Sequence, residues 1–372
     1  MTLEDRHRAL AAAMDAQGLW PTESDWVRRA ILEALPRHSF APGTLWAWNG
    51  VAYVPVERAE RPEEWAALVY GGPYDSTITQ VRDGLPSSSL SCVSVVADML
   101  DSLEVEPGQR VLELGTGAGW NAALLAERAG PGLVTTVEVD ARLASAARHR
   151  LERAGLDVAI HVGDGNAGRP GEAPYDRLVS TYAVDRIPWA WVEQTRPGGR
   201  IVTPWGRLGH VALTVADDGR SATGWMQGLA MFMPRRGADQ GRAFHQVRAD
   251  SVDSAGRGFG TLRRDPRLLG DPHLLFALRV SLPDVRINVS AAPDGFTVEA
   301  HDGHHSWAVR SGNDREFRGG GPRPLLAEIE AAWDHWEEYG SPDLFDFGMT
   351  VGRDRQYVWC GSADSGPWDD RQ

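Results

Sequence analysis

A glycine-rich turn between a predicted strand and a predicted helix is the pattern with the clearest chemistry in this sequence. Residues 111–119 read Val-Leu-Glu-Leu-Gly-Thr-Gly-Ala-Gly. Glycines let the backbone approach a ligand where any Cβ would collide, so the turn is typical of a nucleotide-type site. A dinucleotide fingerprint would have its third glycine at position 120, where this chain has Trp120. The spacing therefore favours S-adenosyl-L-methionine over a dinucleotide.

Carboxylates are expected at the ends of the next two strands. Glu138 follows residues 134–137, and Asp164-Gly165 follows residues 158–162. Glu138 can accept both ribose hydroxyls, Asp164 can accept from the adenine amino group, and Gly165 leaves room for the ring. A tight turn alone is the alternative explanation of the glycines, but it does not explain acids after successive strands. The predicted cofactor-binding residues are Glu113, Gly115, Thr116, Gly117, Gly119, Glu138, Asp164 and Gly165.

Strands and helices alternate around these residues. The expected strands are residues 111–114, 134–137, 158–162, 177–180 and 199–204, and the expected helices are residues 95–103, 121–129 and 142–154. Such alternation implies right-handed crossovers and a mostly parallel sheet covered on both faces. The sequence therefore predicts an α/β fold of the Rossmann-like type.

The flanking segments have other patterns. Residues 1–40 predict two helices, and residues 42–91, rich in Gly, Pro, Ser and aromatic residues, predict mostly loop and short extended segments. A polar, glycine-rich stretch over residues 236–260 indicates a linker. Beyond it, strands are expected at residues 276–280, 285–290, 296–300 and 306–309, a helix at 324–339, a hairpin at 345–360 and a frayed end at 362–372.

These patterns predict two domains. The first covers residues 1–240, with N-terminal helices and a substrate loop over 1–90 and the cofactor-binding sheet over 91–240. A linker over 241–265 and a small α+β domain over 266–372 follow, and this last domain is a candidate for peptide recognition.

Composition excludes several classes of function. The net charge of -13 disfavours nucleic acid as a partner. All 38 basic residues are arginine, which excludes a pyridoxal Schiff base, a Walker A loop and a lysine general base. Two cysteines are too few for a disulfide framework or a cysteine-ligated zinc site, so a cytoplasmic protein is expected. The sequence predicts no export signal and no membrane helix.

A histidine cluster raises the possibility of a metal site. Residues 301–305 read His-Asp-Gly-His-His. A turn around Asp302 and Gly303 explains this cluster better than ligation does, so no metal is predicted.

Several ordered motifs resemble the protein-L-isoaspartate O-methyltransferases. They are residues 111–120, Gly163-Asp164-Gly165 with Gly168, residues 173–177 and residues 197–204, with residues 27–30 and 36–42 upstream and 231–234 downstream. The resemblance covers about the first 240 residues. It implies a Rossmann-like class I S-adenosylmethionine-dependent methyltransferase with a small added C-terminal α+β domain. It also implies methylation of an Asp or isoaspartyl carboxylate in a peptide or protein.

A serine-rich segment lies where this family presents a hydroxyl to the carboxylate. Residues 84–91 read Gly-Leu-Pro-Ser-Ser-Ser-Leu-Ser, and counting back from Val96 places Ser91 on the functional serine. Ser88 and Ser89 are further candidates. A flexible loop or a helix cap is the alternative reading. Cys92-Val93 stand where the family usually has Gln-Pro or Ala-Pro.

Positioning is the main task in such a reaction, because a carboxylate is already ionised at neutral pH. Candidate substrate-binding residues are Arg82, Thr181, Arg235 and Arg236, and ordinary solvated arginines are the alternative for the three cations. Esterification of an aspartyl side chain makes succinimide closure by the next backbone nitrogen easier, and hydrolysis then gives aspartate and isoaspartate.

The serine-rich segment and the additional domain look closest to actinobacterial two-domain relatives associated with ribosomal peptide natural products, the lanthipeptides and graspetides. This likeness implies the tailoring of an Asp in a precursor peptide. General repair of isoaspartyl proteins is the alternative within the same class. A catalytically weak scaffold that keeps the cofactor pocket is the alternative from another class. The sequence does not indicate an oligomeric state.

Overall fold

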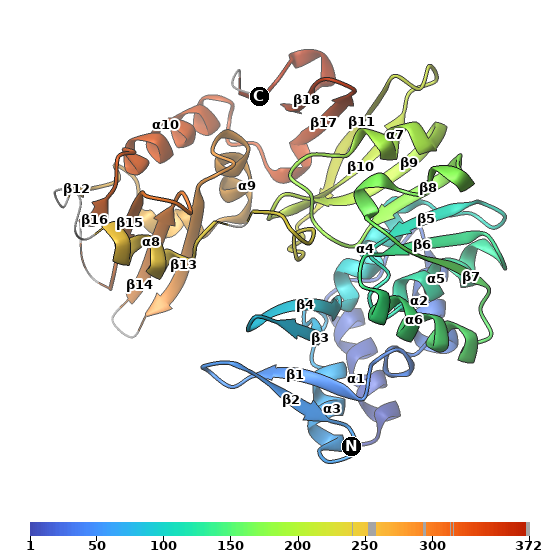
Figure 1. The fold of residues 1–372 in the computed structure, drawn as a ribbon. Coiled ribbons are helices and arrows are strands. Elements are labelled where there is room, and N and C mark those ends of the chain that lie inside the picture. The colour runs from blue at the N-terminus through green and yellow to red at the C-terminus, as the bar shows by residue number, and fades with distance from the viewer. Residues whose placement is uncertain (240, 252–257, 293–294, 313, 315, 370–372) are drawn as a thin grey trace. The chain divides into compact units, whose positions relative to one another are not determined.

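The computed structural model describes residues 1–239, 241–251, 258–292, 295–312, 314 and 316–369 (Figure 1). The chain divides into two compact units. The first unit comprises Met1–Gly224, Ala230–Met233 and Val351–Asp354, and the second comprises Trp225–Leu229, Pro234–Thr350 and Arg355–Gln372.

Helices begin the first unit. They are α1 (Leu3–Ala16), α2 (Asp25–Arg29), a π-helical turn (Ala30–Ala34) and a 3-10 turn (Arg37–Ser39). Thr2 and Asp5 form a capping box that fixes the start of α1, since each side chain accepts from the backbone N–H of the other. The predicted pair of N-terminal helices is therefore present.

A four-stranded antiparallel sheet follows, where the sequence predicted mostly loop and short extended segments. Its order is β2-β1-β3-β4, from β1 (Thr44–Trp48), β2 (Tyr53–Glu57), β3 (Thr77–Arg82) and β4 (Leu85–Leu90), with α3 (Pro62–Val69) between β2 and β3. The short extended segments that the sequence predicted are thus paired strands, and the expectation of loop was wrong for β4, which has neither β-branched nor aromatic side chains. Pairing with β3, through an irregular register, makes this serine-rich segment a strand.

The central sheet of the first unit confirms the predicted α/β pattern. Its strands are β5 (Val111–Leu114), β6 (Val134–Glu138), β7 (Val158–Val162), β8 (Tyr175–Ser180), β9 (Thr195–Trp205) and β10 (Gly209–Val215), in the order β10-β9-β8-β5-β6-β7. All neighbours are parallel except β9 and β10. The strand β11 (Ser221–Gly228) adjoins β10.

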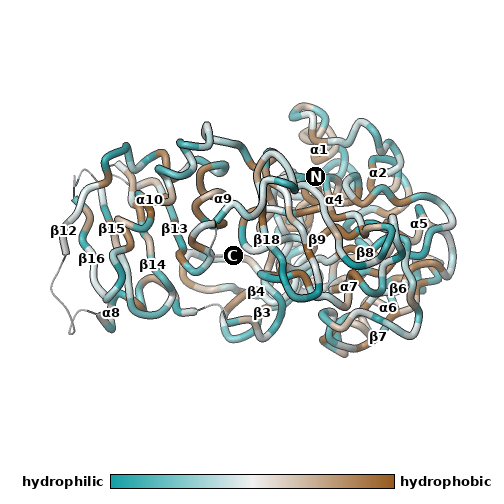
Figure 2. The backbone as a smooth tube through the Cα atoms, turned by 90° about the horizontal axis from the view of Figure 1, so that it is seen from above, coloured by the Kyte–Doolittle hydropathy of each residue, from teal (hydrophilic) through white to brown (hydrophobic). Residues whose placement is uncertain are grey.

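The strand order reverses at β5, which pairs with β6 on one side and β8 on the other. Ligands of open α/β sheets bind beyond the carboxyl ends of the strands at such a reversal. Helix α4 (Val93–Leu103) packs on β8 to β10, and α5 (Trp120–Ala129) and α6 (Ala141–Arg153) pack on β6 and β7. Helix α7 (Trp189–Gln194) packs on β9. Strand β5 is apolar apart from Glu113, and all four of its residues are buried. Figure 2 colours the backbone by hydropathy, with brown hydrophobic and teal hydrophilic stretches in both units.

The second unit is built on a five-stranded antiparallel sheet in the order β12-β16-β15-β14-β13. Its elements are α8 (Phe244–Ser251), β12 (Gly258–Gly260), a 3-10 turn (Pro266–Gly270), α9 (Pro272–Ser281), β13 (Arg286–Ala292), β14 (Gly295–His301), β15 (Trp307–Arg310), β16 (Phe317–Gly320), α10 (Leu325–Glu338), β17 (Phe347–Gly352) and β18 (Gln356–Cys360). Its core includes Leu274, Val298, Phe317, Ile329 and Trp333.

Three expectations for this region were wrong in detail. Residues 276–280 lie in α9, because Asp271 accepts from the N–H groups of His273 and Leu274 and Pro272 stands in the first turn, which together start a helix. The stretch 241–265 expected as a linker contains α8 and β12, and part of it lies outside the described residues. The end expected to fray places Trp368 at 4% exposure, with its indole N–H donating to Ser281 Oγ at 3.1 Å.

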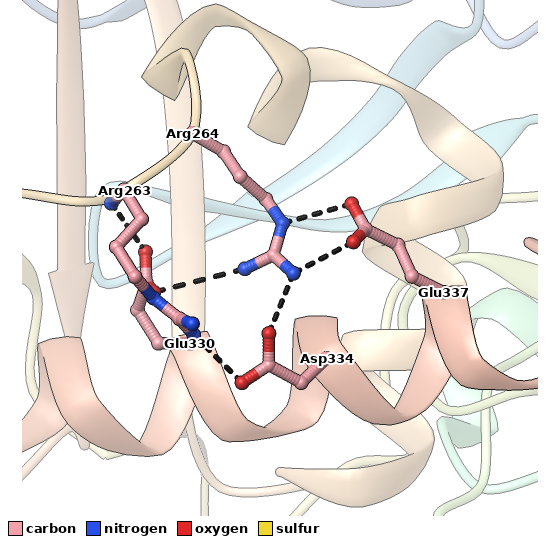
Figure 3. A network of polar contacts seen from close by, with 5 residues as sticks. All are labelled: Arg263, Arg264, Glu330, Asp334 and Glu337. Atoms are coloured by element: carbon pink, nitrogen blue, oxygen red, sulfur yellow. Dashed lines mark hydrogen bonds and ion pairs between the residues drawn. The ribbon is translucent and has the colours of Figure 1, made fainter.

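An ion-pair network joins the segment before α9 to helix α10 (Figure 3). Arg264 donates to both carboxylate oxygens of Glu337, at 2.8 and 2.7 Å, and to Asp334 at 2.5 Å. Arg263 donates to Asp334 at 2.6 Å and also pairs with Glu330. These bonds fix residues 263–264 along α10.

Candidate functional site

The glycine turn after β5 adopts the backbone conformation that its sequence predicts. Gly115, Gly117 and Gly119 have φ values of +96°, +53° and +89°, which L side chains rarely adopt. A Cβ at Gly115 would lie 2.6 Å from Thr181 Oγ1, and one at Gly119 would lie 3.2 Å from Ala147 Cβ. Two glycines are thus required by close packing and all three by the positive φ.

A buried carboxyl group lies beneath this turn. Glu113 is inaccessible to solvent, and its oxygens accept from Asn121 Nδ2 at 2.8 Å and from Thr136 Oγ1 at 2.6 Å. Thr136 Oγ1 also lies 2.7 Å from Thr116 Oγ1. Burial raises the pKa of Glu113 to about 7, although both hydrogen bonds oppose the rise. Glu113 and Thr116 therefore support the turn from inside the fold.

Glu138, at the end of β6, is bound to the glycine turn. Its Oε2 accepts from the backbone N–H of Gly117 at 2.9 Å, and its Oε1 accepts from that of Asp140 at 3.0 Å. Since each carboxylate oxygen has two lone pairs, one acceptor position on each oxygen is left for a pair of hydroxyls. Asp140 in turn caps α6 through the N–H groups of Arg142 and Leu143.

Asp164 and Gly165 follow β7. Asp164 is exposed and accepts from the N–H of Asn166 at 3.0 Å. Gly165 is buried, and Trp191 donates its indole N–H to the Gly165 carbonyl at 2.9 Å. A Cβ at Gly165 would lie only 2.4 Å from the Tyr182 hydroxyl, so a side chain here would displace the aromatic ring.

The serine strand β4 runs beside the glycine turn. Ser88 Oγ lies 3.6 Å and the Ser89 carbonyl oxygen 3.9 Å from the position that a Cβ of Gly117 would occupy. Ser88 is 6% exposed and accepts from Thr79 Oγ1 at 3.0 Å. Among the described residues, the hydroxyls of Ser89 and Ser91 have no hydrogen-bond partner. The structure thus brings Ser88 and Ser89 close to the predicted cofactor loop.

The four predicted substrate-binding residues have different surroundings. Arg82, at the end of β3, pairs with Asp140 Oδ2 at 3.2 Å. The Thr181 hydroxyl donates to the carbonyl groups of Leu114 and Gly115, so it supports the glycine turn. Arg235 and Arg236 belong to the second unit, and Arg235 is exposed. Their role towards substrate stays a prediction.

The sequence analysis assigned no role to Arg37, which lies behind the serine strand. It is 1% exposed, and its guanidinium donates to Val69 O at 3.1 Å, Thr77 Oγ1 at 3.2 Å, Leu90 O at 2.9 Å and Ser91 O. Its Cζ lies 5.0 Å from the centre of the Trp120 ring. Charge patterns do not predict a buried arginine, and residue type alone gave no signal here.

The histidine cluster of the second unit forms the predicted turn. Asp302 Oδ1 accepts from the backbone N–H groups of His304, His305 and Ser306 at 2.8 to 2.9 Å. In the part of the chain that the structure describes, no group of three His, Cys, Asp or Glu side chains could hold a metal ion.

These residues define a class of protein. A glycine turn at the reversal of a mostly parallel sheet, with a carboxylate at the end of the next strand, is the arrangement of a Rossmann-like class I methyltransferase. The residues present fit S-adenosyl-L-methionine, because the three glycines of the turn have no side chains of their own and each oxygen of Glu138 accepts one backbone N–H and retains an acceptor position.

Comparisons with known proteins identify the family. Residues 22–233 match the family model of protein-L-isoaspartate(D-aspartate) O-methyltransferase, PCMT. The protein-L-isoaspartate O-methyltransferase of Hyperthermus butylicus is 34% identical over 200 residues, which are 50% of this chain and 79% of that one. That of Methanopyrus kandleri is 44% identical over 186 residues, 49% of this chain and 70% of that one. The chain therefore belongs to the PCMT family, which comprises carboxyl O-methyltransferases that use S-adenosyl-L-methionine.

A solved structure supports the fold. A protein-L-isoaspartate O-methyltransferase superposes with a TM-score of 0.54 and 22% identity, covering 97% of this chain and 100% of that chain. At this identity the likeness concerns the fold alone.

Proposed function

We propose that this protein methylates an aspartyl or isoaspartyl carboxylate of a peptide at the junction of β4 and the glycine turn, and that a dedicated peptide is its substrate. The observation that carries the proposal is the approach of the serine strand to the cofactor loop, with Ser88 Oγ 3.6 Å from the Cβ position of Gly117. Family membership supports the reaction class.

The residues of the chain have separate tasks in this reaction. Bound S-adenosyl-L-methionine supplies an electrophilic methyl group. The glycine turn, Glu138 and Asp164 would hold the cofactor, through backbone approach and carboxylate acceptors. The hydroxyls of Ser89 and Ser91, which lack partners among the described residues, are available to donate to the substrate carboxylate. They orient the anion without protonating it, so the carboxylate remains nucleophilic.

The product of the transfer has a further reaction open to it. A methyl ester on an aspartyl side chain is a better electrophile than the carboxylate, and the next backbone nitrogen can attack it. Methanol leaves, a succinimide forms, and water then opens the ring to aspartate or isoaspartate. No residue of the protein is needed for this second step.

The second unit is a candidate for binding the peptide substrate. The family match ends at residue 233, whereas the second unit has its own sheet and its own buried core. We infer that this unit recognises the peptide that carries the modified Asp. A cytoplasmic location accords with two free cysteines, Cys92 and Cys360. Among the described residues, no helix combines the length and the apolar character needed to cross a membrane.

Labelled methyl transfer tests the proposal. The full chain is incubated with methyl-labelled S-adenosyl-L-methionine and with matched peptides that differ only in carrying isoaspartate, Asp or Asn, and with short peptides encoded beside its gene. A base-labile label on Asp of one dedicated peptide, absent from the Asn control, is expected. Equal labelling of unrelated isoaspartyl peptides would indicate repair. Cofactor binding without any ester would indicate a scaffold.

A photo-crosslinkable form of the labelled peptide tests the role of the second unit. We expect crosslinks within residues 234–350 in addition to the serine strand. Crosslinks confined to residues 1–224 would show that the second unit does not take part in recognition.

A further inference from the structure

Arg37 is a buried cation with neutral partners. All four of its hydrogen bonds go to backbone carbonyls or to a threonine hydroxyl. Among the described residues no carboxylate pairs with it, and burial lowers its pKa to about 10, so it stays protonated at neutral pH. Burying an unpaired charge is costly, and an apolar side chain would fill the same space at a lower cost. The hydrogen-bonding geometry of this guanidinium therefore requires an explanation.

Two of its bonds hold the two peptide groups on either side of the Ser91 Cα. The carbonyl of Leu90 belongs to the peptide group before that atom, and the carbonyl of Ser91 belongs to the one after it. Both accept from the same guanidinium. Because a peptide group is planar, fixing both planes fixes φ and ψ of Ser91. The direction of its Cα–Cβ bond, which carries the hydroxyl, is therefore constrained by Arg37.

The other face of the guanidinium contacts the cofactor loop. Its Cζ lies 5.0 Å from the ring centre of Trp120, the first residue of α5 and the residue after Gly119. Trp120 is 2% exposed and donates its indole N–H to the Leu35 carbonyl at 3.0 Å. A single planar side chain thus connects the serine loop to the end of the glycine turn.

We propose that Arg37 is a positioning residue for the methyl transfer: it orients the Ser91 hydroxyl with respect to the glycine turn by holding both peptide groups of Ser91 while it stacks on Trp120. Arg37 itself contacts neither cofactor nor carboxylate. This inference rests on the proposed function, because it assigns to Ser91 the hydroxyl that meets the substrate.

Lysine at this position tests the geometry while it keeps the charge. One ammonium group cannot reach four acceptors spread around a planar fork, and it cannot stack on an indole. In the full chain, Arg37→Lys should therefore lower kcat roughly 10- to 100-fold, as expected for a misplaced reacting group. The dissociation constant of S-adenosyl-L-methionine should stay within about threefold, since the residues expected to hold the cofactor are intact.

A matched control separates positioning from stability. Arg128 also stacks on a tryptophan, Trp26 at 5.5 Å, and donates to a backbone carbonyl, Val105 O at 2.8 Å. It has no bond to the serine loop. Arg128→Lys should lower thermal stability, since Arg128 also pairs with Glu106 at 2.8 Å, and should leave kcat unchanged. Equal losses of kcat in the two variants would overturn the proposal.

A double substitution shows whether Arg37 acts through Ser91. If it does, adding Arg37→Lys to Ser91→Ala should lower kcat by less than about threefold beyond Ser91→Ala alone. Fully multiplicative losses would contradict the proposal, because Arg37 would then act independently of that hydroxyl.

Hydrogen exchange gives a readout that does not depend on activity. In Arg37→Lys, amide exchange should rise in residues 88–93 while α5 and the central sheet stay protected. Absence of any methylation by the wild-type protein would refute the proposed function, and the exchange result would still decide whether Arg37 holds the serine loop. Unchanged exchange at residues 88–93 in Arg37→Lys would refute the inference by itself.

Discussion

The backbone N–H of Gly117 and the Oε2 atom of Glu138 lie 2.9 Å apart, so the glycine turn and the end of β6 form one polar unit. The second oxygen of the same carboxylate accepts from the N–H of Asp140, the cap of α6. Glu138, which is expected to bind the cofactor ribose, therefore also connects the glycine turn to the start of α6.

Glu138→Gln should weaken cofactor binding by about 10- to 100-fold. An amide has only one acceptor oxygen, so its NH2 group would face either Gly117 or Asp140 and leave a buried donor unpaired, at a cost of about 1–3 kcal/mol. Calorimetric titration with S-adenosyl-L-methionine measures the effect. Glu152→Gln on the exposed surface of α6 is the control, and affinity equal to the control would contradict the role of Glu138.

Gly117→Val should abolish cofactor binding in a folded protein. Its φ of +53° is strained for a β-branched residue, and the added methyl groups would enter the space beside Ser88, which already lies 3.6 Å from a Cβ. Asp164→Ala should have a smaller effect, because the exposed Asp164 loses one acceptor and no packing. Undiminished affinity of a folded Gly117→Val protein would contradict the site.

Glu113 should make folding stability depend on pH near neutrality. Burial raises its folded pKa from 4.5 to about 7, so the folded state binds the extra proton between these values. The stability it contributes is complete below pH 4.5 and is lost as the pH rises through about 7. Thermal unfolding measured from pH 4 to 8 should show a smaller decline for Glu113→Gln than for the wild type. An equal decline in the wild type and in Glu113→Gln would show that the buried carboxyl does not titrate in this pH range.

His38 should make folding stability decrease towards acid pH, whereas Glu113 makes it decrease towards alkaline pH. Its Nδ1 lies 2.6 Å from the Tyr70 hydroxyl, and burial lowers its pKa below the ordinary 6.5. The unfolded chain therefore takes up a proton first, and stability that is complete above pH 6.5 is lost as the pH falls below that value. His38→Gln should flatten this acid limb in the same unfolding series. If the loss of stability at acid pH is the same in His38→Gln as in the wild type, other groups, such as His7, cause that loss.

The fold of the first unit could be predicted from sequence where short-range signals agree. The run before Gly115 is fully apolar apart from Glu113, and strands with helices alternate after it, so β5 to β9 were all expected. The strand β4 could not be predicted, since its serines have low strand propensity and only pairing with β3 makes them extended. Residues 276–280 in α9 were mistaken for a strand because a short run that is apolar except for Arg279 fits either structure, and the Asp271-Pro272 start signal decides between them.

In the candidate site, too, only the groups with a local sequence signal could be predicted. Spacing predicted the glycine turn and the carboxylate Glu138, because each follows a strand directly. The buried partners of these groups, Asn121 and Arg37, required the tertiary structure, since nothing in their local sequence distinguishes them from solvated residues. The sequence placed Arg82 with the substrate, whereas its bond to Asp140 became visible only when β3 was seen beside the start of α6.

The network on α10 should stabilise the second unit measurably. Arg264 is 19% exposed and binds Glu337 with two parallel hydrogen bonds, which is the geometry in which ion pairs contribute most. Arg264→Gln should lower the unfolding free energy of this unit by about 1 kcal/mol. Arg267→Gln, which removes only an exposed pair with Asp265, is the control. Equal unfolding midpoints of both variants in urea would show that the network adds no stability.

Ser91→Ala should lower the rate of methyl transfer while cofactor affinity stays nearly intact. One hydrogen bond to a charged group contributes about 1.5 to 3 kcal/mol, so a loss of order 10- to 100-fold in kcat is expected. Single-turnover rates with a labelled methyl donor measure it. Ser89→Ala should have a milder effect, and Ser88→Ala should act mainly through the strand, because the Ser88 hydroxyl is buried and accepts from Thr79. An unchanged rate in Ser91→Ala together with an inactive Ser89→Ala would move the functional hydroxyl to β4 and would show that counting back from Val96 assigned the wrong serine.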